Sequence, residues 1–190
     1  MKKLYIIFGV ILCLLAPCTA SAASLTDTIK YVQKSEKMTK TGYTQQKVAF
    51  KALPSVKSKT LKKIKVNTEL KYRKYNKSWA MTIYNGRLGF VKIKQIKQPD
   101  YTPSYFKRMG IIRYNGWRWT WYSQRVLPGG GLKIPGRHVD KATGFVCDQD
   151  GYICLASNNI GYHKVVSTPF GRKGKIYDSG CSGIDMYVSW

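Results

Sequence analysis

The chain has 190 residues, with 33 Lys and Arg against 9 Asp and Glu and a formal net charge of +24. Hydrophobic residues make up 44% and aromatic residues 13%, which weighs against a long disordered polyelectrolyte. The length excludes a large multidomain enzyme and allows one medium domain or two small ones.

Residues 1–22 have the layout of a cleaved secretory signal peptide. Two lysines precede an apolar run from Leu4 to Ala16, and small residues suited to cleavage stand at 20–22. The run is too short and wrongly flanked for a lasting membrane span, so no stable span is expected; an uncleaved anchor is the alternative. Cys18 is a candidate for lipidation, but the proline directly before it, Pro17, fits a lipidation site poorly. The sequence therefore predicts an exported protein, secreted or held at the cell wall.

The predicted location decides which partners the positive charge would attract. Outside a bacterial cell the abundant polyanions are wall polymers and anionic lipid headgroups, which attract a dense Lys surface by counterion release. Residues 23–100 carry 19 Lys and Arg against 4 acids, and residues 101–190 carry 12 against 5. The first half is therefore expected to adhere to peptidoglycan and anionic wall polymers, with no nucleic-acid partner. We expect a monomer. The alternative for the charge is that it only keeps the protein soluble.

The first half is expected to contain a linker and a small barrel. Residues 23–46 are polar, and their short helix-compatible pattern fades after Val32, so we expect a linker with one or two helical turns. Residues 47–98 alternate apolar and polar side chains, and Asn85-Gly86 supplies a tight hairpin turn. This period of two predicts a small barrel with one buried face.

Three features of this segment resemble the bacterial SH3-like domain. They are the run from Leu53 to Lys59, its spacing to Trp79, and the hairpin Asn85–Val91. The resemblance implies a module that targets peptidoglycan or other wall components. We expect Trp79 and Phe90 to be core residues only. Any ligand groove would then lie among less distinctive aromatics such as Tyr72, Tyr75 and Tyr84.

A second linker, residues 99–112, is predicted from its two prolines, and a Gly- and aromatic-rich domain follows at 113–190. Trp117, Trp119 and Trp121 alternate with other residues, which puts three indoles on one side of a strand. Trp119 and Trp121 are candidate substrate-binding residues that would stack on sugar rings; the alternative is that they fill a core. In the loop that follows, Arg137 and His138 are candidates for binding a carboxylate or moving a proton; ordinary loop residues are the alternative.

The last forty residues combine strand-like spacings with glycines at the corners, as in a closed barrel. The segments Cys147–Gly151, Ile176–Gly180 and Ile184–Val188 resemble the double-psi β-barrel of the three-aspartate domain, rare lipoprotein A and lytic transglycosylase A. The resemblance implies three acidic positions, taken here by Asp150 (or Asp148), Asp178 and Asp185. The predicted fold is thus all-β: an SH3-like barrel and a six-stranded double-psi β-barrel behind a signal peptide.

The resemblance also implies a chemistry. In a lytic transglycosylase one carboxyl protonates the leaving oxygen and then accepts the proton of the attacking hydroxyl. Asp185 would be this acid/base, Asp178 would raise its pKa by charge repulsion, and Asp150 would belong to the surrounding hydrogen-bond network.

Two features of the sequence count against catalysis. The loop between Asp178 and Asp185 is shorter than in the transglycosylases, and the neighbouring basic residues Arg172, Lys173 and Lys175 would depress carboxyl pKa values. The alternatives are a non-catalytic wall-binding or assembly protein with a degenerate site, or aspartates that serve only in turns.

Three cysteines remain after the signal peptide: Cys147, Cys154 and Cys181. Export permits a disulfide from Cys181 to either of the others, with one thiol left unpaired. With His138 or His163 the cysteines reach the number of ligands in a zinc site but not its spacing. We therefore expect no metal and no cofactor.

Overall fold

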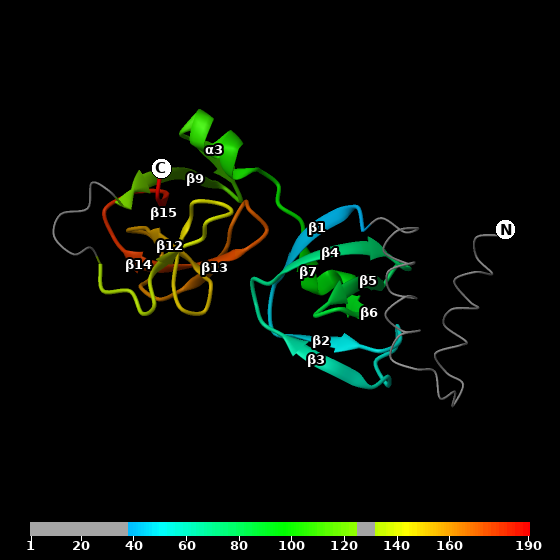
Figure 1. The fold of residues 1–190 in the computed structure, drawn as a ribbon. Helices are drawn as coiled ribbons and strands as arrows, with labels where there is room; N and C mark the ends of the chain where they lie inside the picture. Colours follow the sequence, from blue (N-terminus) through cyan, green and yellow to red (C-terminus); the bar gives the residue numbers. More distant parts are fainter. Residues whose placement is uncertain (1–37, 125–131) are drawn as a thin grey trace, which may run out of the picture.

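The computed structural model describes residues 38–124 and 132–190, which form two β-sheets side by side (Figure 1). This confirms the all-β prediction. The predicted signal peptide and most of the predicted linker 23–46 lie outside the described residues. In the described part of the chain, no helix has the length and apolar character that crossing a membrane requires.

The first sheet has seven strands in the order β3-β2-β6-β5-β4-β1-β7, all paired antiparallel. The predicted hairpin turn lies between β5 and β6, where Asn85 and Gly86 have φ of 50° and 71°. The strands are β1 Lys40–Thr44, β2 Val48–Lys51, β3 Thr60–Ile64, β4 Glu69–Lys74, β5 Trp79–Tyr84, β6 Arg87–Lys92 and β7 Ile96–Lys97, with a 3-10 turn η1 at Ile93–Gln95.

Alternate residues of β5 and β6 build two separate apolar clusters on the first sheet. Ala80 and Val91 enter the main core, together with Val48, Phe50, Ile64, Leu70 and Tyr72. Trp79, Met81 and Phe90 point to the other face and form a smaller cluster. Trp79 and Phe90 are therefore buried as expected, but outside the main core, whereas Tyr72 is a core residue.

Strand β1 corrects the predicted boundary at residue 47. Its buried positions are Gly42 and Thr44, which give no apolar signal in the sequence. Position 42 has little room for a side chain, because a Cβ there would lie 2.6 Å from Ile96 Cγ2. The buried Thr44 hydroxyl donates to the Lys65 carbonyl oxygen at 2.6 Å. The first sheet thus starts at Lys40, inside the predicted linker.

Residues 99–112, the second predicted linker, contain a helix, α3 Pro103–Met109. The Thr102 hydroxyl accepts the Tyr105 N–H at 3.2 Å, and Pro103 occupies the first turn, where no N–H is needed. Phe106 anchors the helix in the second core, where its side chain is fully buried. Pro103, one of the two prolines that indicated a linker, therefore starts a helix.

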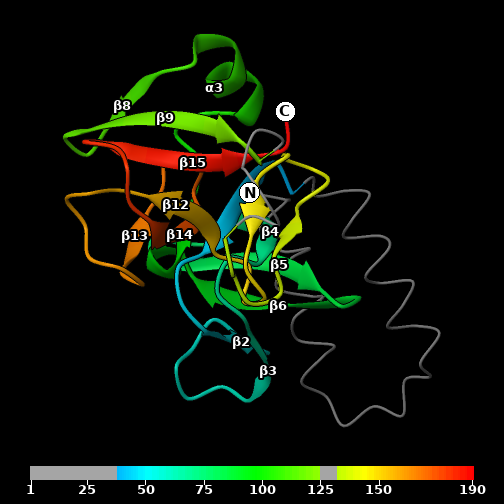
Figure 2. The same ribbon diagram turned by 90° about the vertical axis from the view of Figure 1, so that its left-hand side faces the viewer.

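The second sheet has eight strands and includes two parallel pairs, β9 with β15 and β12 with β14. Figure 2 shows β9 and β15 lying side by side. The order is β10-β11-β12-β15-β9-β8, with β14 on β12 and β13 on β14. The strands are β8 Ile112–Tyr114, β9 Trp117–Ser123, β10 His138–Val139, β11 Val146–Cys147, β12 Ile153–Ala156, β13 Val165–Ser167, β14 Lys173–Asp178 and β15 Ile184–Val188.

The core of the second sheet is built around Trp119, against which Trp117 and Trp121 also pack. The three indoles thus share one side, as the alternation predicts. The remaining buried members are Phe106, Ile112, Phe145, Cys147, Ile153, Leu155, Phe170, Ile176, Ile184, Met186 and Val188.

The two sheets meet through hydrogen bonds to main-chain atoms. The Asn67 amide donates to the carbonyl oxygens of Gly151 (2.9 Å) and Lys173 (3.1 Å) and accepts the Lys173 N–H (2.7 Å). Gln45 donates to the Gly171 carbonyl oxygen at 2.6 Å. The short connection from β7 to α3 adds the Asp100 N–H, which donates to Pro169 O at 2.9 Å.

Candidate functional site

The sheet register brings Asp178 and Asp185 to the two sides of Ala156, the last residue of β12. Asp178 on β14 is the parallel partner of Ala156, and Asp185 on β15 is its antiparallel partner. Adjacent strands lie about 4.8 Å apart, which puts the two aspartate Cα atoms roughly 10 Å from each other. The two acids predicted from the closing strands therefore share one region of the sheet.

Asp185 is half-buried and bound to a neighbouring strand. Its Oδ1 accepts the hydroxyl of Thr120 at 2.7 Å, and Thr120 is its register partner on the parallel strand β9. Burial raises the pKa of Asp185, and the Thr120 hydroxyl, the Met186 N–H and the Arg118 charge only partly offset this. Asp185 thus holds its proton to a higher pH than an ordinary aspartate.

Asp178 has different partners. Its Oδ2 accepts the Tyr187 hydroxyl at 2.5 Å, and its Oδ1 accepts the Ser179 N–H at 2.8 Å. Burial, the Asp178 hydrogen bond and the nearby carboxylates raise the pKa of Tyr187, so this hydroxyl remains a donor. The two carboxyls are therefore held separately. The raised pKa of Asp185 comes from burial and not from the expected repulsion by Asp178.

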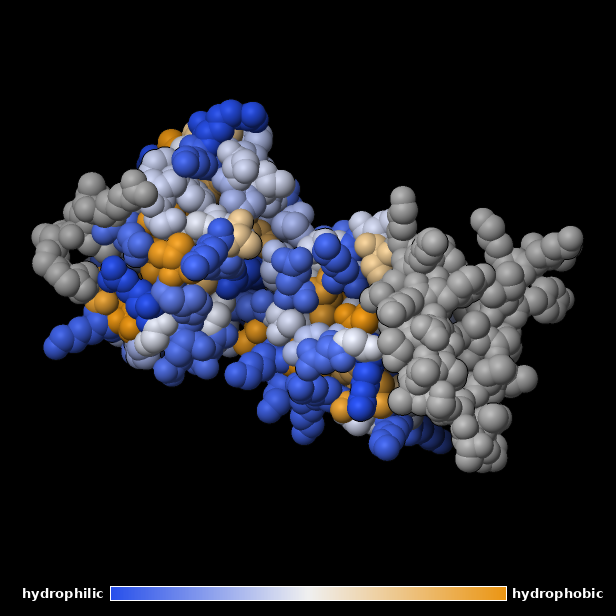
Figure 3. Space-filling view, in the orientation of Figure 1, coloured by the Kyte–Doolittle hydropathy of each residue, from blue (hydrophilic) through white to orange (hydrophobic). Residues whose placement is uncertain are grey.

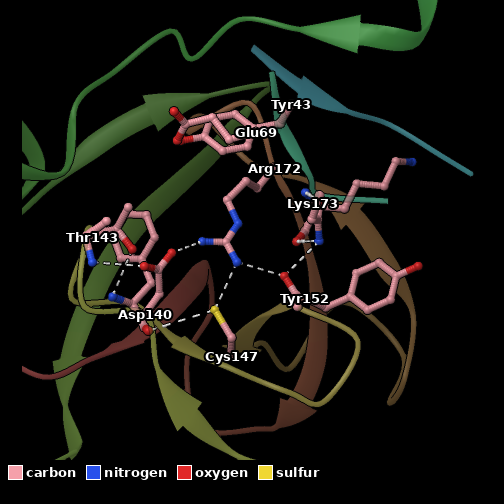
Figure 4. A network of polar contacts seen from close by, with 12 residues as sticks. Tyr43, Glu69, Asp140, Thr143, Cys147, Tyr152, Arg172 and Lys173 are labelled. Atoms are coloured by element: carbon pink, nitrogen blue, oxygen red, sulfur yellow. Dashed lines mark hydrogen bonds and ion pairs between the residues drawn. The ribbon is translucent and has the colours of Figure 1, made fainter. Parts of the chain in front are cut away.

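The basic residues near these acids in sequence are paired elsewhere. Arg172 Nη1 lies 2.5 Å from Asp140 Oδ2, and its Nη2 contacts Cys147 Sγ at 3.2 Å (Figure 4). Lys175 Nζ lies 3.0 Å from Asp148 Oδ2. Two of the three cations that were expected to depress the pKa of Asp185, Arg172 and Lys175, are thus paired with other carboxylates, and the cation that does lower this pKa is Arg118.

Asp150 is not part of the pair. It is exposed in the turn that precedes β12, at the opposite end of that strand from Ala156. The Asp150 N–H donates to Asp148 Oδ1 at 2.9 Å. Asp148 itself is fully buried and accepts the Tyr177 hydroxyl at 2.8 Å. This position therefore stabilises a turn and a buried ion pair, as Asx residues commonly do in loops.

The candidate substrate-binding residues are also dispersed. Trp119 is 1% exposed and its Nε1–H donates to Tyr114 O at 3.2 Å, so it cannot be a sugar platform. Trp121 is half-buried with its ring edge-on to Trp190. Arg137 donates to Gln124 Oε1 at 3.4 Å. His138, on β10, pairs with β11, three strands from β15.

Sequence reasoning missed the residues that surround the acid pair. Alternation along β15 puts Tyr187, two residues after Asp185, on the same face, whereas Thr120 is brought to Asp185 by the pairing of β9 with β15. Tyr162 is 61% exposed, and its ring lies 4.1 Å from that of His163 and 6.4 Å from that of Tyr177. Tyr162 and His163 thus form an exposed aromatic pair against Tyr177, which no periodic pattern in the sequence marks.

The three described cysteines are free thiols, so the disulfide considered for Cys181 is absent. Cys147 and Cys154 are buried, and burial raises the pKa of both thiols. Among residues 38–124 and 132–190, no three His, Cys, Asp or Glu side chains form a group that could hold a metal ion.

Comparison with known proteins gives no relative: no protein-family model matches the chain, and a search of curated proteins finds no match.

Proposed function

We propose that the protein is exported and acts at the bacterial cell wall, where it binds the glycan strands of peptidoglycan and cleaves them with Asp185. In this proposal the first sheet is an SH3-like barrel that adheres to the wall. The second sheet is a six-stranded double-psi β-barrel. The two parallel strand pairs and the N-terminal signal-like segment support it. The observation that carries it is Asp185, which is half-buried and has a raised pKa. It lies across Ala156 from a second acid, Asp178, at the end of β14.

The chemistry needs only one carboxyl. The protonated Asp185 would donate to the glycosidic oxygen that leaves, while the Thr120 hydroxyl fixes the orientation of the carboxyl. The resulting carboxylate would accept the proton of the sugar hydroxyl that closes an anhydro ring. A hydrolytic glycosidase would usually need two carboxyls across the bond, and Asp178 is bound to Tyr187 instead.

A second candidate is a wall-binding protein without catalysis. The short loop between the two acids favours it, because the loop is fixed to the segment that follows β12. Asn158 Oδ1 accepts the Gly180 N–H at 2.6 Å, and the Asn159 amide donates to Ser182 O at 2.6 Å. A loop held this way covers less surface for a substrate than a long one.

The test is incubation of the purified protein with purified peptidoglycan between pH 4 and 8, followed by mass spectrometry of the released fragments. The enzyme releases anhydro-muropeptides, and Asp185→Asn lowers their rate by about 100-fold or more, because the amide cannot donate the proton. Asp100→Asn is the matched control, since it removes an exposed carboxylate that forms an ion pair with Lys97 on the first sheet. Binding without release establishes the second candidate, and absence of both overturns the wall assignment.

A further inference from the structure

A cavity of about 410 Å³ opens on the first sheet where β5 begins and β6 ends. Its lining is Val56, Lys77, Ser78, Trp79, Lys92 and Lys94. Trp79 and Lys92 are register partners on the two strands, and the loop between β2 and β3 contributes Val56. This cavity is distinct from the acid pair, which lies on the second sheet.

The charged side chains among the described lining residues are all positive: three ammonium groups and no carboxylate. Residues 40–97 contain 16 Lys and Arg and one acid, Glu69, which accepts the Tyr43 hydroxyl at 3.1 Å. Glu69 starts β4, whereas the cavity adjoins the end of that strand, where Lys74 pairs with Ala80. Figure 3 shows hydrophilic side chains projecting from the β2 and β3 side of this sheet.

The apolar part of the cavity consists of one buried and one exposed side chain. Trp79 is only 7% exposed and has the Lys92 ammonium 5.9 Å from its ring centroid, while Val56 is 61% exposed. Single-stranded nucleic acids are bound by aromatic rings that are open for base stacking. A largely buried indole offers no such platform, so the cavity suits a compact group better than a row of bases.

The described lining residues include three lysines and no arginine. Lys binds phosphate as a point charge, whereas the flat fork of Arg pairs with carboxylates and phosphates alike. Lysines alone therefore fit a phosphate, and the polygalacturonate competitor below tests a carboxylate ligand. The volume lies within the range of small-ligand sites, roughly 300–1,000 Å³, so it holds a phosphate together with a polyol or sugar unit.

We infer that this cavity binds the repeating unit of a phosphodiester-linked polyol or sugar polymer. Lys77, Lys92 and Lys94 contact the phosphates, and Trp79 and Val56 contact the carbon skeleton. The wall as the source of such a polymer rests on the proposed function. The site itself rests on the cavity and its lysines.

Binding is measured by calorimetry with a poly(glycerol phosphate) oligomer at two salt concentrations. The variant Lys77→Gln/Lys92→Gln/Lys94→Gln is compared with Lys62→Gln/Lys63→Gln/Lys71→Gln, which removes the same charge from exposed positions of the same sheet. We expect the cavity variant to bind at least about 10-fold more weakly than this control. Equal losses in the two variants overturn the proposal, because they show attraction by net charge alone.

A single change at the rim gives a second test. Val56→Asp places a carboxylate beside the lysines and weakens binding, whereas Val165→Asp, at an exposed valine of the second sheet, leaves it unchanged. A polygalacturonate and a DNA oligonucleotide serve as competitors, and equal or tighter binding of either in the cavity overturns the phosphate-polyol assignment. Since no probe contains peptidoglycan glycan, the result does not depend on whether the second sheet binds or cleaves it.

Discussion

Two aspartates of the second sheet show how the partner of a buried carboxyl decides its charge. Burial alone would raise the pKa of Asp148, but hydrogen bonds from Lys175, Tyr177 and the Tyr152 N–H hold it below its usual value. Asp185 has the Thr120 hydroxyl as its partner and forms no ion pair within residues 38–124 and 132–190, and burial raises its pKa. The first aspartate is therefore suited to a structural ion pair, and the second to proton transfer.

These opposite shifts predict opposite effects of pH on stability. Because the folded-state pKa of Asp185 is raised, its contribution is complete below the pKa of the unfolded chain and is lost as pH rises through the folded-state value. Asp185→Asn removes this loss, so the free energy of unfolding of the variant rises relative to wild type between pH 3 and pH 7. Urea unfolding at several pH values measures the difference.

Asp148→Asn is the control of opposite sign. The lowered pKa of Asp148 gives stability that is present above the pKa of the unfolded chain and lost as pH falls. Relative to wild type, this variant therefore loses stability as pH rises. Parallel stability curves for Asp185→Asn and wild type would contradict the assignment of a raised pKa.

At the scale of elements, strand β1 completes the first sheet by pairing with both β4 and β7. Gly42 allows β7 to approach, since a Cβ would meet Ile96 Cγ2 at 2.6 Å and Lys97 O at 3.0 Å. We predict that Gly42→Ala lowers the free energy of unfolding by about 1–3 kcal/mol, the usual cost of overpacking. Chemical denaturation measures this cost.

Thr41→Ala provides the comparison, because Thr41 lies on the same strand and is partly exposed. Its effect should stay within about 0.5 kcal/mol, as for other surface changes. If the two variants lose the same free energy of unfolding, the close approach of β7 to Gly42 does not explain the loss in Gly42→Ala.

The same elements show what the sequence could reveal. Asn85-Gly86 has strong local turn chemistry, and the indoles of β9 alternate regularly, so both were predictable. Strand β1 was not, because Gly42 and Thr44 are buried for reasons of space and hydrogen bonding that leave no apolar pattern.

The site was predictable only in part. Asp178 and Asp185 stand in recognisable strand-end motifs, and the structure places both beside Ala156. Their partners depend on contacts between strands, as does the pairing of Arg172 with Asp140, 32 residues away in sequence. No local pattern encodes such contacts.

At the scale of the whole molecule, the three hydrogen bonds of Asn67 couple the two sheets. Asn67 has φ of 59°, a conformation that glycine also adopts, so Asn67→Gly removes the contacts without backbone strain. At about 1 kcal/mol for each hydrogen bond, we expect a loss of about 2–3 kcal/mol of coupling. Differential scanning calorimetry should then resolve two unfolding transitions in place of one.

Asn85→Gly is the matched variant, since Asn85 also has a positive φ but lies in an exposed hairpin turn of the first sheet. It should keep a single transition. A single transition of unchanged midpoint in Asn67→Gly would show that other contacts hold the sheets together.

The contacts of Asn67 and Gln45 end on main-chain atoms of Gly151, Gly171 and Lys173. Every residue type has a carbonyl oxygen, and all but proline have an amide hydrogen, so these contacts do not involve side chains of the second sheet. Two of the positions still require glycine, because Gly151 and Gly171 have φ of 82° and 74° and a Cβ at Gly171 would lie 3.0 Å from Lys97 O. Surface side chains of the second sheet away from these three positions can therefore change without loss of the contacts that Asn67 and Gln45 make.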